Sequence, residues 1–94
     1  MSYYYTTKEL CQNTVDSWGR DSQLMMLLEE MCELQKEVLK NMNRKQDNVK
    51  AIAEETADVL IMLERLIHIY DIADQVDAQA AFKVNRVKGY LGMK

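Results

Sequence analysis

Two pairs of acidic residues are the part of this chain whose types and spacing best suit chemistry. Glu30 and Glu33 form the first pair, and Glu55 and Asp58 form the second. Residues three apart lie on one face of an α-helix, so each pair would present two carboxylates side by side. Like charges at this spacing repel one another, and the repulsion grows when the groups leave water. The spacing therefore suggests a site for a divalent cation, although a single Glu-x-x-Glu usually marks a solvated helix face.

The donor types indicate which cation such a site would hold. Oxygen donors alone favour Mg²⁺, with Mn²⁺ as a substitute, whereas zinc sites are usually built with His or Cys. Cys11 and Cys32 form no CxxC motif, and we expect both to be reduced thiols in or near the core. His68 follows Glu64 by four residues, so the Glu-x-x-His pair of di-iron bundles is missing. We expect this histidine at the surface or at an interface.

The elements that must position these acids are predicted to be helices. The chain has 94 residues, no Pro, only three Gly and seven Met, and it is 48% hydrophobic and 29% charged. This composition suits one soluble domain, residues 1–94, and favours long helices. We expect an all-α, antiparallel helical bundle of about four helices.

The expected helices follow from apolar spacing and from capping residues. The first runs over 7–18, with Leu10, Val15 and Trp18 as its apolar positions, and Gly19 ends it. The others run over 21–41 with Asp21 or Ser22 as cap, from 47 or 48 to 70, and from 75 to 89 or 92 after an Asp74 cap. The polar stretch 41–48 is expected to be the loop that makes the second and third helices antiparallel.

The acids should flank the packed faces of these helices. Glu30, Glu33 and Glu37 fall within a stripe of about 60°, roughly 100° from the apolar stripe of the second helix. Glu55 and Asp58 share their stripe on the third helix with apolar neighbours. The methionines of both helices are expected to pack in the core, namely Met25, Met26, Met31 and Met62.

The acids and the residues around them resemble a known family. Glu30-x-x-Glu33, twenty-one intervening residues and Glu55-x-x-Asp58 resemble the signature of the MazG-like, all-α nucleoside triphosphate pyrophosphohydrolases. The flanking words also match, from Trp18-Gly19 and Gln23 through Leu28-Glu29-Glu30 to Ala57-Asp58-Val59-Leu60. The resemblance covers about residues 18–66 and extends more loosely toward Tyr90.

The resemblance implies a function and a set of roles. A helical protomer would form a homodimer or a dimer of dimers through a helical interface. With Mg²⁺, it would cleave a (deoxy)nucleoside triphosphate to the monophosphate and pyrophosphate. The implied metal ligands are Glu30, Glu33, Glu55 and Asp58, and Glu33 and Glu29 are the candidates for the base.

Candidate nucleotide-binding residues lie outside the acidic pairs. Lys83 and Arg86 share a helix face that would suit phosphate oxygens, and Asn85 lies between them; a solvated basic face is the alternative. Trp18 would suit stacking on a base, although a core or interface anchor is the commoner role. Gln23 would help to position a ligand, or be an ordinary surface residue.

Other partners and functions are constrained by charge and hydropathy. The net charge of −3 argues against a dedicated nucleic-acid binder, and no apolar run is long enough to span a membrane. The polar, tyrosine-rich N-terminus does not look like a signal peptide, so a cytoplasmic location is expected. The alternatives to an enzyme are a regulatory module that binds nucleotide and metal without turnover, and a purely structural helical oligomer.

Overall fold

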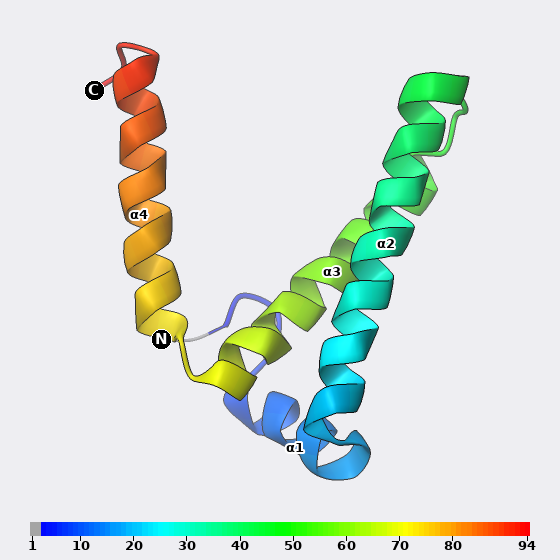
Figure 1. Cartoon of the computed structure of the whole chain (residues 1–94), viewed down its shortest axis with the longest axis vertical. Helices are drawn as coiled ribbons and strands as arrows, with labels where there is room; N and C mark the ends of the chain where they lie inside the picture. The colour runs from blue at the N-terminus through cyan, green and yellow to red at the C-terminus, as the bar shows by residue number, and fades with distance from the viewer. Residues whose placement is uncertain (1–2) are drawn as a thin grey trace.

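The computed structural model describes residues 3–94, and the regular secondary structure in that range is all helix (Figure 1). The four helices are α1 (Lys8–Trp18), α2 (Arg20–Arg44), α3 (Val49–Tyr70) and α4 (Ala73–Tyr90). The predicted all-α class and the number of helices are confirmed. α1, α2 and α3 pack together, whereas α4 projects away from them.

A sharp corner at Gly19 joins α1 to α2. Thr7 caps α1 by accepting a hydrogen bond from the Leu10 N–H, at 3.1 Å. Gly19 has φ of 91°, a region that few other residues adopt, and its N–H closes α1 on the Val15 carbonyl. The same glycine precedes the first residue of α2, so the predicted caps at Asp21 and Ser22 were wrong. The corner turns α1 across the base of the α2–α3 pair (Figure 1).

The connection between α2 and α3 is shorter than the sequence suggested. α2 continues to Arg44, three residues past the expected end, and Lys45 then stops it in a left-handed conformation with φ of 52°. The Asn48 side chain donates to the Glu37 carbonyl at 2.9 Å and to the Glu37 carboxylate at 3.2 Å. Asn41 in turn donates to the Gln46 carbonyl and to Asn48. These amides stabilise the tight turn, which the polar composition alone did not reveal.

Contacts along α2 and α3 confirm that the two helices are antiparallel. Asn48 meets Glu37 near the turn, and Arg65 donates to Gln23 at 2.7 Å at the far end. Leu27, Val59 and Met62 are buried between these two points. α1 adds Cys11 and Thr14 to the core, whereas Leu10 and Trp18, expected to pack, are 45% and 61% exposed.

Hydrogen bonds hold the segment before α1 against α3, on the side of the helix that carries Glu64. The buried carboxylate of Glu64 accepts hydrogen bonds from the backbone N–H groups of Tyr4, Tyr5 and Thr6 at 2.9–3.0 Å. The Thr6 hydroxyl donates to the same group at 2.7 Å. A single glutamate therefore fixes the position of residues 4–6, which lead into α1.

α4 leaves the packed body. It begins at Ala73, because Asp71 turns the chain with φ of 53°, and the predicted cap at Asp74 was therefore wrong. The helix contacts only α3, and none of its residues is buried. The radius of gyration is 16.0 Å, whereas a compact chain of this length would have about 12 Å. The difference reflects a helix that packs on little of its own chain.

Several predicted core residues are exposed. Met62 is buried as expected, but Met25, Met26 and Met31 are 56%, 38% and 39% exposed. Both cysteines are free, and only Cys11 is in the core, since Cys32 is exposed. The apolar surface of α2 is wider than the strip that α1 and α3 cover, which explains these errors. No helix in the described range is long and apolar enough to cross a membrane.

Candidate metal centre

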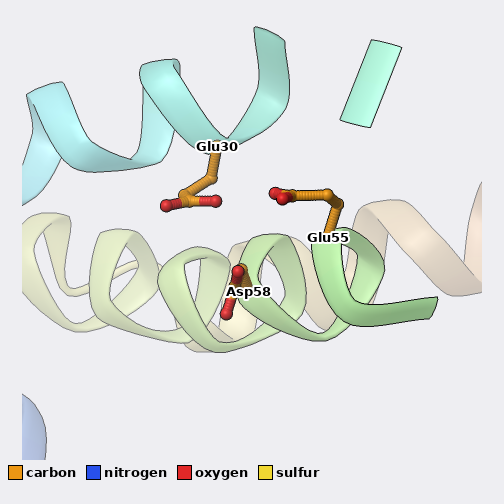
Figure 2. Close-up of side chains that lie close together, drawn as sticks. All are labelled: Glu30, Glu55 and Asp58. Carbon is orange, nitrogen blue, oxygen red and sulfur yellow. The ribbon is translucent and has the colours of Figure 1, made fainter. Parts of the chain in front are cut away.

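Three of the predicted acids converge between α2 and α3. Glu30 extends from α2 toward α3, and Glu55 extends from α3 toward Glu30 (Figure 2). Asp58 lies one turn after Glu55 on α3. One carboxylate oxygen from each residue lies within 4.8 Å of the other two. The acidic cluster of Glu30, Glu55 and Asp58 is therefore a candidate site for a cation.

The antiparallel register explains why these residues meet. Gln23 lies opposite Arg65, so Glu30, seven residues after Gln23, lies opposite Asp58, seven residues before Arg65. Seven residues are about two turns, which keeps all four side chains on the facing sides of the two helices. The core residues Leu27 and Met62 lie in the same stretch. Local spacing and helix packing together place the acids across from one another.

The electrostatics of the cluster are unfavourable without a counter-charge. Burial and the neighbouring carboxyl groups of Glu55 and Asp58 raise the pKa of Glu30 from 4.5 to about 7. One carboxylate oxygen of Glu55, Oε2, is buried and has no hydrogen-bond partner within residues 3–94. The ion pairs of that part of the chain join Arg20 to Asp21 and Lys40 to Glu37, so none neutralises the cluster.

The residues present fit a hard divalent cation. All three donors are carboxylates, the ligands by which proteins hold Mg²⁺ or Mn²⁺ while leaving positions for water and phosphate oxygens. A buried oxygen without a partner, on a carboxylate that has two other acids beside it, is costly unless something positive binds there. The cluster thus offers both the donor set and a reason to bind a cation.

The remaining acids of the predicted site stand apart from the cluster. Glu33 lies one turn beyond Glu30 on α2 and is exposed, and its carboxylate is not among the three that converge. Glu29 is also exposed. Their predicted roles, as a fourth ligand and as the base, stay predictions.

The predicted nucleotide-binding residues are scattered over the chain. Lys83, Asn85 and Arg86 are exposed on α4, and the Arg86 guanidinium lies over the Phe82 ring of the same helix at 5.6 Å. α4 has few contacts, all with α3, and projects away from the α2–α3 pair (Figure 1), so these groups are not brought to the acids within one chain. Trp18 is exposed at the end of α1, which rules out the core role.

Gln23 is buried, contrary to the expectation of a surface residue. It is only 1% exposed, and its side-chain oxygen accepts from the Arg65 guanidinium. Its amide nitrogen lies 3.5 Å from the Met26 sulfur. The position of Gln23 seven residues before Glu30, on the same helix face, was the signal that could have identified it.

His68 lies at an interface, one of the two expected places, whereas the role of Glu64 was not predicted. The His68 ring nitrogen Nε2 is 2.8 Å from the Gln12 oxygen of α1, so it lies half-buried at an interface within the chain. Glu64 turns away from the acidic cluster and binds the N-terminal segment. This role of Glu64 could not be predicted from the sequence, because every non-proline residue has a backbone N–H donor and residue type does not show which of them meet a carboxylate.

Comparisons of the chain with protein-family models, with curated proteins and with solved structures gave no match. The resemblance to MazG-like proteins is carried by the motif and its flanking residues alone.

Proposed function

We propose that this chain is a MazG-like, Mg²⁺-dependent nucleotide pyrophosphohydrolase that cleaves a (deoxy)nucleoside triphosphate to the monophosphate and pyrophosphate. The observation that carries the proposal is the convergence of the Glu30, Glu55 and Asp58 carboxylates from two helices. The unpartnered Oε2 of Glu55 adds to it, since an acid placed only for solubility would face water. Hydrolysis of anhydrides in stray nucleotides would make it a house-cleaning enzyme of the cytoplasm.

Each acid has a role in this proposal. Glu30, Glu55 and Asp58 would hold Mg²⁺, or Mn²⁺ in its place, and Glu33 would supply a fourth ligand. A bound cation shields phosphate charge, lowers the pKa of water and stabilises the leaving pyrophosphate. Glu33 or Glu29 would accept the proton of the attacking water at a carboxylate oxygen. Both are exposed, so either is free to reach a substrate above the cluster.

A homodimer, or a dimer of such dimers, belongs to the same proposal. α4 and the residue that follows it expose apolar side chains with no cover from their own chain: Phe82, Val84, Val87 and Leu91 are each at least 50% exposed. α3 has an apolar hollow of about 340 Å³ on the side away from the acids, lined in part by Ala53, Leu60 and Ile61. Burying such surfaces against a second copy would contribute about 25 cal/mol per Å². It would also bring Lys83, Asn85 and Arg86 close to the acidic cluster of another subunit.

The catalytic part of the proposal is tested by pyrophosphate release. Canonical and modified nucleoside triphosphates are incubated with the protein and Mg²⁺ or Mn²⁺. Asp58→Asn and Glu30→Gln should each lower the rate by about a hundredfold or more, because each removes a metal ligand. Glu54→Gln, a neighbouring exposed acid outside the cluster, is the matched control and should keep the rate.

The outcomes separate the enzyme from its alternatives. No release from any nucleotide at high protein concentration would contradict the enzymatic proposal. Tight nucleotide binding without products would point to a regulatory module. The dimer is tested by sedimentation equilibrium, where Val87→Glu should shift the protein toward monomer, and a monomeric wild type would refute the assembly.

A further inference from the structure

Arg65 is a charged side chain that the acidic cluster leaves unexplained. It is half-buried on α3, and the part of the chain that the structure describes offers it no carboxylate partner. Its Nη1 donates to the Gln23 oxygen at 2.7 Å and lies 3.2 Å from the Met62 sulfur, a weak acceptor. Its Nε is buried and has no partner. The guanidinium is thus held in place by neutral groups, with its charge uncompensated.

A buried side chain of the facing helix holds Arg65 in position. Gln23 is the largest fully buried polar side chain of the core and positions the guanidinium from the facing helix. A surface arginine would need no such partner, since water satisfies its donors. Gln23 engages Nη1, and Nε is buried, so Nη2 is the donor group of Arg65 that is left to bind an external anion, phosphate above all.

The position of Arg65 relates this charge to the acids. Arg65 is seven residues from Asp58, and Gln23 is seven residues from Glu30, so both ends of the pair lie about 10 Å along the helices from the cluster. Because Gln23 holds the guanidinium at its own level, the separation applies to the charge as well as to the backbone. Asp58 and Arg65 therefore lie on one stripe of α3, where Asp58 is exposed and Arg65 is only partly buried, so that a cation site and an isolated positive charge lie two turns apart.

We infer that Arg65, positioned by Gln23, binds the phosphate groups of a linked polyphosphate whose other end is held at the Glu30, Glu55 and Asp58 cluster. This inference rests on the proposed function and adds a specificity residue to it. A single phosphate is too short to contact both Arg65 and the acidic cluster. A chain of three phosphates covers more of the roughly 10 Å between them. The site thus selects tripolyphosphate and nucleoside triphosphates over orthophosphate and monophosphates.

Calorimetry with inorganic tripolyphosphate and Mg²⁺ tests the inference without relying on turnover. The wild type should bind tripolyphosphate more tightly than orthophosphate. Arg65→Met should weaken tripolyphosphate binding about tenfold or more, since charge-assisted hydrogen bonds are lost. It should leave the affinity for Mg²⁺ alone unchanged. Arg44→Met, which removes an exposed charge at the end of α2, is the control and should bind as the wild type does.

Gln23→Glu separates an anion-binding role from a structural one. The substitution gives Arg65 an internal carboxylate of nearly the same shape, so the melting temperature should hold or rise. Tripolyphosphate affinity should fall nonetheless, because the guanidinium charge is then already paired. A Gln23→Glu protein that binds tripolyphosphate like the wild type would overturn the inference.

Other outcomes are equally decisive. If Arg65→Met hydrolyses nucleotides and binds tripolyphosphate like the wild type, the inference fails and the proposed function stands. If Arg65→Met instead changes the sedimentation of the protein with no loss of affinity, Arg65 serves a subunit interface and the inference is wrong. If the wild type binds neither Mg²⁺ nor tripolyphosphate, the proposed function fails and takes the inference with it.

Discussion

Glu64 and Glu55 lie on the same helix, and the structure treats their carboxylates in opposite ways. Glu64 is 6% exposed and accepts hydrogen bonds from the backbone of Tyr4, Tyr5 and Thr6. Glu55 has a buried oxygen with no partner and two other acids nearby. The first carboxylate is complete without a ligand, and the second is not. A structural acid differs from a candidate metal ligand less in burial than in whether its buried oxygens accept hydrogen bonds.

The two faces of α3 explain the contrast. Glu64 follows Glu55 by nine residues, which places it on nearly the opposite side of the helix. The N-terminal segment covers the Glu64 side and brings backbone donors to it. α2 covers the Glu55 side and brings another acid, Glu30. A cation would give the Glu55 side the compensation that the Glu64 side receives from the chain itself.

The largest effect is expected from removing Glu64. Glu64→Ala should lower the free energy of unfolding by about 3 kcal/mol, because it leaves partly buried N–H groups without an acceptor. Glu54→Ala is the matched control on an exposed position of the same helix, and we expect a change within about 0.5 kcal/mol. Urea denaturation measures both. A loss at Glu64 no larger than at Glu54 would mean that the N-terminal segment is not held by this carboxylate.

A cation should act on one side of α3 only. At about 100 times its dissociation constant, Mg²⁺ should raise the free energy of unfolding by about 2.7 kcal/mol, by mass action. Glu55→Gln should abolish that gain, and Glu64→Gln should keep it despite a lower starting stability. Thermal melts with EDTA and with increasing Mg²⁺ follow the gain. A Mg²⁺ response that survives Glu55→Gln would place the metal elsewhere.

The sequence predicted the acidic cluster better than it predicted the surroundings. Spacing within each helix and an antiparallel pair were enough to bring Glu30, Glu55 and Asp58 together, because both are properties of helix geometry. The ends of α1 and α3, at Gly19 and Tyr70, were also predicted. The end of α2 was not, because the left-handed conformation of Lys45 that stops this helix after Arg44 is not indicated by its residue type. The acids were thus predictable, while the turn between α2 and α3 was not.

The burial of polar side chains was the feature least evident from residue type. Gln23 resembled a surface residue, since Gln is usually exposed, yet it is among the most buried side chains. Glu64 resembled one more charge on α3 until its backbone partners were seen. The exposed methionines of α2 show the reverse error, because an apolar pattern does not say how much of it one chain covers. Partners, within the chain or outside it, decide these cases.

Neutralising Glu55 without metal should stabilise the protein slightly. Glu55→Gln removes one charge from the acidic cluster and gives the buried position a donor, so the metal-free protein should gain about 0.5–1 kcal/mol. Glu64→Gln should have the opposite sign, because an amide accepts fewer hydrogen bonds than the carboxylate. Urea denaturation in EDTA compares the two. Loss of stability in both variants would mean that Glu55 is also held by the fold, and the contrast between the two faces would then disappear.

The smallest effect concerns pH, because Glu30 keeps some contact with water that screens its neighbours. Burial and the nearby acids raise the pKa of Glu30 in the folded protein from 4.5 to about 7. Folding therefore favours the protonated form, and the stability that this proton confers is complete below about pH 4.5 and is lost as pH rises through about 7. Mg²⁺ competes with the proton, so its stabilising effect should grow over the same window.

The difference between the wild type and Glu30→Gln isolates this effect from the other titrating groups. In EDTA, the advantage of the wild type at about pH 5 should shrink toward about pH 8, whereas Glu30→Gln should lack that component. With Mg²⁺, the slope of the difference should reverse, because the ionised carboxylate is then the form that folding favours. Denaturation series at fixed ionic strength, with and without the cation, measure both slopes. Identical slopes in EDTA and in Mg²⁺ would show that the cation does not meet Glu30, and the acidic cluster would then be one more charged surface of α2 and α3.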